Sequence, residues 1–237
     1  MKVFISRMIP EAGLKYLRNA GVEISVWTEK RDLLPEELIA YCKDADALLS
    51  AGGNKIDKTF LNAVRHLKVI SLHSVGYDNV NIAAANEIKM PIGNTPGVLS
   101  DATADIAFLL MLATSRKAFY MSRTIQEGRW GFFEPTANLG IDIRGKVLGI
   151  YGLGKIGYEL AKRASAAFGM KIIYHNRTHN EEAEKALHAQ WVSFEELLKM
   201  SDVLSVNTAL TTETKGKFNK EVFAKMKPTA IFINAAR

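Results

Sequence analysis

The apolar residues of this chain gather in short runs that alternate with segments of helical composition. Short apolar runs rich in branched residues are typical of strands buried in a parallel sheet. In the first part of the chain they predict strands over residues 2–6, 22–27, 47–50, 68–72 and 91–94. The segments between them predict helices over residues 10–20, 36–43, 58–65 and 81–88. Strands that alternate with helices of this length imply a parallel sheet with right-handed crossovers.

A second series of the same kind begins with the apolar run at residue 147 and ends with a strand predicted over residues 229–234. Between the two series, the segment Asn-Thr-Pro-Gly at residues 94–97 is the clearest boundary signal. A helix predicted over residues 102–121 is apolar on most faces, and an irregular arm over residues 122–140 follows it. We therefore expect an α/β protein of two doubly wound domains, at residues 1–96 and 97–237.

The second series opens with three glycines spaced G-x-G-x-x-G. Gly152 permits a tight turn, Gly154 lets the backbone approach a pyrophosphate, and Gly157 allows close packing of a helix on a strand. The spacing alone is a weak signal because glycines also cluster in ordinary turns. Here it follows a strand, opens a helix and meets a second strand at residues 171–175, which is the context of a dinucleotide-binding motif. The phosphates would lie on the free N–H groups of that helix.

The residues that follow the second strand of this unit distinguish between the two nicotinamide cofactors. An Asp or Glu here binds the ribose 2′-hydroxyl of NAD, whereas an Arg accommodates the 2′-phosphate of NADP. This chain has Asn176, Arg177 and Thr178, with no carboxylate at the tip of the strand. A guanidinium can pair with a phosphate through two hydrogen bonds, although the alternative is that Arg177 is a solvated loop residue. The sequence thus favours NADP(H), with NAD(H) as the other possibility.

Composition narrows the classes of protein to be considered. Among the 237 residues, 48% are hydrophobic and 24% charged, as in globular proteins, and the apolar run at residues 106–113 is too short to span a bilayer. The N-terminal residues do not have the pattern of a signal peptide. The chain has a single cysteine, Cys42, as expected for a protein of the reducing cytoplasm. The net charge of +6 is scattered rather than clustered, so an anionic cofactor and substrate explain it without nucleic acid. No spacing typical of metal ligands is present.

Ligands of open α/β sheets bind beyond the carboxyl ends of the strands, and three such ends carry informative residues. A glycine in the segment 74–78 lets backbone N–H groups face an anion such as a substrate carboxylate. Small residues at 207–209 leave room for an adenine-ribose moiety. After the last strand, Ala235 and Ala236 permit close approach of a nicotinamide, and Arg237 supplies a bidentate cation. These features suit hydride transfer to a small 2-oxo acid.

Together, five segments resemble the D-isomer-specific 2-hydroxyacid dehydrogenases, and most closely their glyoxylate/hydroxypyruvate reductase branch. The segments cover nearly the whole chain in the order of that family, at residues 74–78, 94–97, 102–105, 152–157 and 232–237. The resemblance implies a flavodoxin-like substrate domain and a Rossmann domain that lacks its C-terminal end. It also implies a homodimer formed through the helix at 102–121 and the arm at 122–140.

The resemblance assigns roles to individual residues. The N–H groups of Val75 and Gly76 would bind the substrate carboxylate, and Arg237 would hold the substrate and polarise its carbonyl as the catalytic cation. The pyrophosphate would lie, beyond the turn at Gly152, on Leu153, Gly154, Lys155, Ile156 and Gly157. The 2′-phosphate would lie on Asn176, Arg177 and Thr178, and the rest of the cofactor on Thr103, Thr208, Ala209, Thr214, Ala235 and Ala236.

Two departures from the family pattern leave other hypotheses open. Asn207 and Ala209 replace a His and a Pro that are frequent in members using NAD, which agrees with NADP(H). In this family a His protonates the carbonyl oxygen and a Glu keeps that His protonated, and both come after Arg237, so we expect the chain as given to bind cofactor with little turnover. The alternatives are a non-catalytic NAD(P)-binding regulatory protein and an NAD-dependent dehydrogenase of another 2-hydroxy acid.

Overall fold

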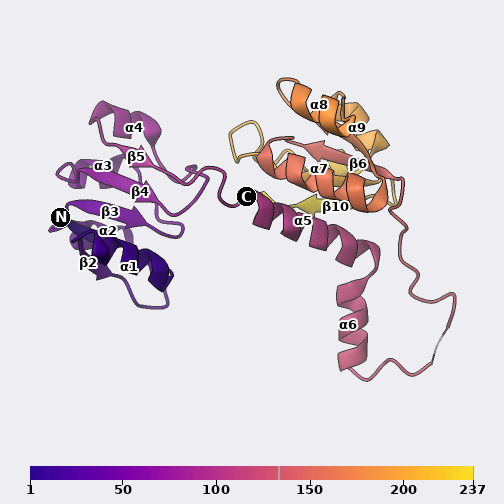
Figure 1. Ribbon diagram of the computed structural model, residues 1–237, viewed down its shortest axis with the longest axis horizontal. Coiled ribbons are helices and arrows are strands. Elements are labelled where there is room, and N and C mark those ends of the chain that lie inside the picture. Colours follow the sequence, from indigo (N-terminus) through magenta and orange to yellow (C-terminus); the bar gives the residue numbers. More distant parts are fainter. Residues whose placement is uncertain (133, 237) are drawn as a thin grey trace. The chain divides into compact units, whose positions relative to one another are not determined.

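A computed structural model describes residues 1–132 and 134–236 and divides the chain into two compact units, at residues 1–98 and 99–237 (Figure 1). Each unit is built on one parallel sheet of five strands. The predicted α/β fold with two doubly wound units is therefore confirmed.

The sheet of the first unit has the strand order β2-β1-β3-β4-β5, which is the flavodoxin-like order. Its strands are β1 (Lys2–Ile5), β2 (Glu23–Val26), β3 (Ala47–Ser50), β4 (Val69–Leu72) and β5 (Ile92–Gly93). Its helices are α1 (Glu11–Asn19), α2 (Pro35–Cys42), α3 (Lys58–Ala63) and α4 (Ile82–Glu87). Alternate residues of β1 enter two separate cores: Val3 and Ile5 pack with Leu14 of α1, whereas Phe4 packs with Leu38 of α2. The sheet is thus covered on both faces.

The second unit has the strand order β10-β9-β6-β7-β8, which is 3-2-1-4-5 when read from the other edge, as in a Rossmann fold. Its strands are β6 (Val147–Tyr151), β7 (Lys171–His175), β8 (Gln190–Trp191), β9 (Val203–Val206) and β10 (Ile231–Asn234). Its helices are α5 (Ser100–Ser115), α6 (Ala118–Gln126), α7 (Lys155–Phe168), α8 (Glu181–Leu187), α9 (Phe194–Met200) and α10 (Lys220–Phe223). Leu148 and Ile150 of β6 pack in one core with Met111 of α5 and Leu160 of α7.

The prediction of a single helix over residues 102–121 is wrong, because the structure has two helices there. α5 ends at Ser115, Lys117 adopts a left-handed conformation with φ of 53°, and α6 begins at Ala118 and runs into the predicted arm (Figure 1). The returning chain explains the break, because the N–H of Ile141 donates to the carbonyl oxygen of Ser115 at 2.7 Å. In a continuous helix that carbonyl would accept a hydrogen bond from the N–H four residues later. Gly140 allows this close approach, since a Cβ there would collide with the same carbonyl.

Candidate functional site

The three glycines of the G-x-G-x-x-G motif have different surroundings. Gly152 has φ of +95°, and a Cβ on it would lie 2.5 Å from Cγ2 of Thr208. A Cβ on Gly157 would lie 2.8 Å from the carbonyl oxygen of Gly152, so this position sets the close packing of α7 on the turn. Gly154, in contrast, has no atom within 4 Å of the Cβ position, so space is open above its backbone. A phosphate can approach the chain at that point.

The first turn of α7 has no side-chain cap, because its N-cap residue is Gly154. The N–H groups of the first helical residues, which include Lys155, Ile156 and Gly157, have no partner within the helix. Such free N–H groups, together with the positive end of the helix dipole, form an anion-binding site. The N–H of Leu153, which was also expected to bind pyrophosphate, donates instead to Oδ1 of Asn176 at 2.6 Å.

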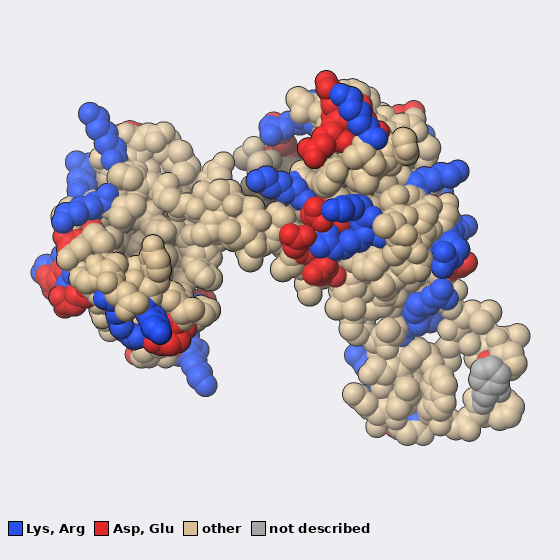
Figure 2. All heavy atoms as spheres, in the orientation of Figure 1, with Lys and Arg blue, Asp and Glu red and all other residues tan. Residues whose placement is uncertain are grey.

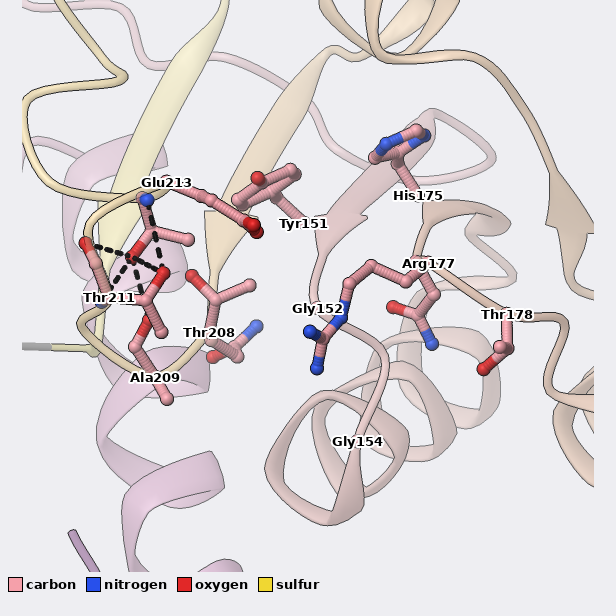
Figure 3. Close-up of a pocket in the computed structure, with 13 residues that line it drawn as sticks. Tyr151, Gly152, Gly154, His175, Arg177, Thr178, Thr208, Ala209, Thr211 and Glu213 are labelled. Atoms are coloured by element: carbon pink, nitrogen blue, oxygen red, sulfur yellow. Dashed lines mark hydrogen bonds between the residues drawn. The ribbon is translucent and has the colours of Figure 1, made fainter. Parts of the chain in front are cut away.

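A pocket of about 340 Å³ opens where β6, β7 and β9 end (Figure 3). It brings together residues that lie far apart in the sequence, namely Tyr151, Gly152, Gly154, His175, Asn176, Arg177, Thr178, Asn207, Thr208, Ala209, Thr211, Glu213 and Thr214. Eight of these are predicted cofactor-binding residues: Gly152, Gly154, Asn176, Arg177, Thr178, Thr208, Ala209 and Thr214. A pocket at the carboxyl ends of parallel strands is the usual ligand site of such a fold.

The Arg177 side chain extends across this pocket toward Gly152 and Gly154 (Figure 3). Within the described residues its guanidinium has no hydrogen bond and no ion pair, unlike Arg163, which pairs with Asp101 and Glu159. An unpaired guanidinium in a pocket retains its full capacity to bind an anionic group.

The loop that carries Arg177 is held at both ends. At its start, the Asn176 side chain bonds both the N–H and the carbonyl oxygen of Leu153, at 2.6 and 3.2 Å. At its end, the N–H of Asn180 donates to the Tyr174 hydroxyl at 2.7 Å, and that hydroxyl donates to Glu184 at 2.6 Å. Burial raises the pKa of the Tyr174 phenol, so it remains a donor at neutral pH. Asn176 therefore fixes the glycine turn against the end of β7.

The opposite wall of the pocket is a loop closed by two threonines. The Thr214 hydroxyl donates to the carbonyl oxygen of Ala209 at 2.8 Å and accepts the N–H of Thr211 at 2.8 Å (Figure 3). The proton of that hydroxyl is therefore engaged within the loop rather than directed at a ligand. Thr214 shapes the wall of the pocket.

Other predicted site residues are not among the residues that line this pocket. Thr103 lies on α5, and Ala235 and Ala236 follow β10. In the first unit, Val75 and Gly76 follow β4, and within the described part of the chain their N–H groups donate to no residue. The Ser74 hydroxyl and the Asn94 side chain fix this segment through the carbonyl oxygens of Gly76 and Val75, at 2.7 and 2.9 Å. Arg237, the predicted catalytic cation, lies outside the described residues.

Five lining residues are not among the expected cofactor ligands, namely Tyr151, His175, Asn207, Thr211 and Glu213, and three of these contribute an aromatic ring or a carboxylate. Tyr151 lies parallel to His175, with 5.9 Å between the ring centroids. Glu213 contributes a carboxylate from the loop after β9. No local pattern marks Glu213, because only the tertiary fold brings the loop after β9 beside the end of β6.

Among the residues that the structure describes, no group of three or more His, Cys, Asp and Glu side chains could hold a metal ion. No helix in the described parts of the chain has the length and apolar character needed to cross a membrane.

The Rossmann-type sheet, the glycine turn and the pocket define a dinucleotide-binding α/β protein. Residues 108–237 match the family model of the D-isomer specific 2-hydroxyacid dehydrogenase, NAD binding domain. The chain belongs to this family of nicotinamide-dependent oxidoreductases, as the sequence predicted.

Relatives and solved structures agree with that assignment. The chain is 42% identical to a glyoxylate reductase of Thermococcus litoralis and 41% to one of Pyrococcus horikoshii; each match covers the whole chain, and 72% and 71% of those proteins. The crystal structure of a glyoxylate reductase from Paecilomyes thermophila matches with a TM-score of 0.86 at 34% identity, over the whole chain and 74% of that structure. A solved protein of Thermus thermophilus has a TM-score of 0.92 at 38% identity, with the same coverage.

Proposed function

We propose that this chain binds NADP(H) in the pocket of its second unit and serves the reduction of a small 2-oxo acid, of the glyoxylate or hydroxypyruvate type, to the D-2-hydroxy acid. One observation carries the cofactor preference: Arg177 extends into the pocket without a partner among the described residues, and the tip of β7 has no carboxylate. A guanidinium there stabilises a 2′-phosphate, whereas the NAD-type site needs an acid at that tip. The relatives that are glyoxylate reductases support the substrate class.

Separate groups would hold the substrate and the cofactor. The reduced nicotinamide would supply a hydride to the carbonyl carbon of the substrate. The free N–H groups of Val75 and Gly76 would hold the substrate carboxylate, and the guanidinium of Arg237 would polarise the carbonyl. The first turn of α7, from Lys155, would hold the pyrophosphate. The family resemblance puts the proton-donating His and its Glu after Arg237, so a polypeptide of residues 1–237 by itself is expected to bind without turning over.

The test measures the binding of NADPH and NADH separately from turnover. Titration calorimetry on the chain should give a dissociation constant for NADPH at least about tenfold lower than for NADH, since a charge-assisted pair contributes about 1.5–3 kcal/mol. Equal affinities would refute the role of Arg177. Oxidation of NADPH with glyoxylate is then followed by absorbance. A polypeptide of residues 1–237 that turned over at the rate of a full reductase would contradict the assignment of the proton donor.

We also propose that α5, α6 and the arm after them form the contact of a homodimer. Phe119 and Tyr120 of α6 are 64% and 50% exposed, and in the arm Trp130 is 57% and Phe132 89% exposed. Figure 2 shows that the visible face of α6 and the arm carries few charged side chains. Exposed aromatic side chains on a face with few charges are typical of a protein interface. Phe133, another aromatic residue of the arm, lies outside the described residues.

Sedimentation equilibrium tests the dimer directly. A charge introduced by Phe119→Asp should convert the dimer to a monomer, because burying an unpaired carboxylate in an apolar contact costs several kcal/mol. Tyr16→Asp is the matched control, since Tyr16 of α1 is 77% exposed and belongs to the other unit. A monomeric wild-type chain, or a dimer that both variants leave intact, would refute this contact.

A further inference from the structure

Glu213 lines the pocket from the wall opposite the loop that carries Arg177, and its side chain points toward Tyr151 (Figure 3). Among the residues that the structure describes, Glu213 has no hydrogen-bond donor and no cation as a partner. Several other carboxylates of this unit are engaged: Glu195 pairs with Lys225, and Glu159 with Arg163. A carboxylate that lines a pocket and lacks a partner is available to a ligand.

The backbone around Glu213 is fixed by hydrogen bonds within its loop. Thr211, two residues before it, and Thr214, directly after it, bond each other and Thr214 bonds Ala209, which closes the loop into a compact turn. The ring of Tyr151 is only 9% exposed, because it packs against His175, Phe194 and Phe218 and the Lys217 ammonium lies 5.6 Å from its centroid. The loop therefore presents an acceptor next to a fixed aromatic ring.

The chemistry of the cofactor decides which group can meet this carboxylate. At neutral pH a carboxylate only accepts hydrogen bonds, and it repels phosphate. The 2′-phosphate and the pyrophosphate are therefore excluded as neighbours of Glu213, and they are better placed at Arg177 and at the first turn of α7. Two donors remain at the adenosine end, the exocyclic amino group of adenine and the ribose 3′-hydroxyl. The 3′-hydroxyl is on the carbon next to the one that carries the 2′-phosphate, so it lies toward Arg177 and leaves the amino group for Glu213 on the opposite wall.

We propose that Glu213 determines the specificity for the adenine base by accepting a hydrogen bond from its exocyclic amino group. This inference rests on the proposed binding of NADP(H) in the same pocket. The adenosine end is then recognised from two sides: the guanidinium of Arg177 binds the 2′-phosphate, and the carboxylate of Glu213 binds the base. The ribose 3′-hydroxyl is the other donor at this end, and the experiment separates it from the amino group.

The experiment compares two fragments of the cofactor, adenosine 2′,5′-bisphosphate and purine riboside 2′,5′-bisphosphate, which differ only in the amino group. Calorimetric titration of the wild-type chain should show the adenine compound binding about tenfold more tightly, as expected for one hydrogen bond to a charged acceptor. In Glu213→Ala this ratio should fall below about twofold. Because both compounds carry the same phosphates, the ratio does not depend on the loss of a negative charge near Arg177.

The control variant is Glu221→Ala, which removes an exposed carboxylate of α10 that does not line the pocket and should keep the wild-type ratio. Retention of the wild-type ratio by Glu213→Ala, with an unchanged thermal midpoint, would overturn the inference. A second result would also overturn it: Glu213→Ala keeps the preference for the adenine compound over the purine compound, but loses a wild-type preference for adenosine 2′,5′-bisphosphate over its 3′-deoxy analogue. That result would assign Glu213 to the ribose. Failure of the proposed cofactor looks different: adenosine 5′-monophosphate would then bind the wild type as tightly as the 2′,5′-bisphosphate.

Discussion

Replacing Gly152 with alanine tests whether the glycine turn is a tightly constrained element of the second unit. The residue has φ of +95°, which an L-residue adopts only with strain, and its Cβ would lie 2.5 Å from Cγ2 and 3.0 Å from the backbone N of Thr208. The left-handed backbone costs about 1–2 kcal/mol. Overpacking against an immobile neighbour adds about 1–3 kcal/mol. We therefore expect Gly152→Ala to lower the free energy of unfolding of this unit by about 3 kcal/mol.

Two other glycines separate the contributions. Gly145 has φ of +67° and no atom within 4 Å of its Cβ position, so Gly145→Ala isolates the backbone strain, at about 1 kcal/mol. Gly154 has an extended backbone with φ of −92° and open space around the Cβ position. Gly154→Ala should therefore change stability by less than about 1 kcal/mol, because the loss of an N-cap glycine is offset by a less flexible unfolded chain. Its added methyl group should nevertheless weaken NADPH binding about tenfold or more, because it stands where the pyrophosphate approaches.

Amide hydrogen exchange of the peptide that contains β6 (Val147–Tyr151) measures the second unit separately from the first. Protection factors of this peptide give the free energy of opening for each variant, and titration with NADPH gives the affinity. The expected order of destabilisation is Gly152→Ala, then Gly145→Ala, then Gly154→Ala. If Gly152→Ala cost no more than Gly145→Ala, the contact with Thr208 would not constrain the turn.

Three further predictions follow from individual side chains. Arg177→Gln should weaken the binding of NADPH at least about tenfold in the same titration and leave the binding of NADH unchanged. The reason is that the lost pair involves only the 2′-phosphate. An equal loss of affinity for both cofactors would refute a phosphate contact. Burial alone would raise the pKa of Asp202, but Lys227 at 2.8 Å and the N–H of Val147 at 2.9 Å hold that pKa below its ordinary value. A lowered pKa in the folded state contributes stability above the ordinary value near 3.8 that is lost as pH falls through the folded value. Acid titration of the unfolding free energy should thus show a smaller loss below about pH 4 in Asp202→Asn than in the wild type, and identical curves would exclude the pairing. Burial raises the pKa of the Cys42 thiol to about 12. Iodoacetamide at pH 8 should therefore label Cys42 only in denaturant, which mass spectrometry can detect. Rapid labelling of the native chain would contradict the burial of this thiol.

Several features of this protein could be predicted because they are encoded locally. The alternation of apolar runs and helical segments predicted two parallel sheets, since a strand buried on both faces requires an uninterrupted apolar run. The G-x-G-x-x-G spacing predicted the turn between β6 and α7, because the close contacts of Gly152 and Gly157 leave no room for a Cβ. Arg177 could be located because it lies in the loop immediately after β7. These inferences need only the residues on either side of a strand end.

Contacts between distant segments decided the rest. The helix predicted over residues 102–121 divides at Lys117 because Ile141, far along the chain, takes the hydrogen bond of the Ser115 carbonyl. Asn176, expected as a phosphate ligand, uses its carboxamide to fix Leu153, and Glu213 enters the pocket only because the sheet places β9 beside β6. The composition and the spacing of a sequence determine which strands and turns form. Which side chains share a pocket depends on the strand order and on loop conformations that hydrogen bonds fix across it, and these exist only once the chain has folded.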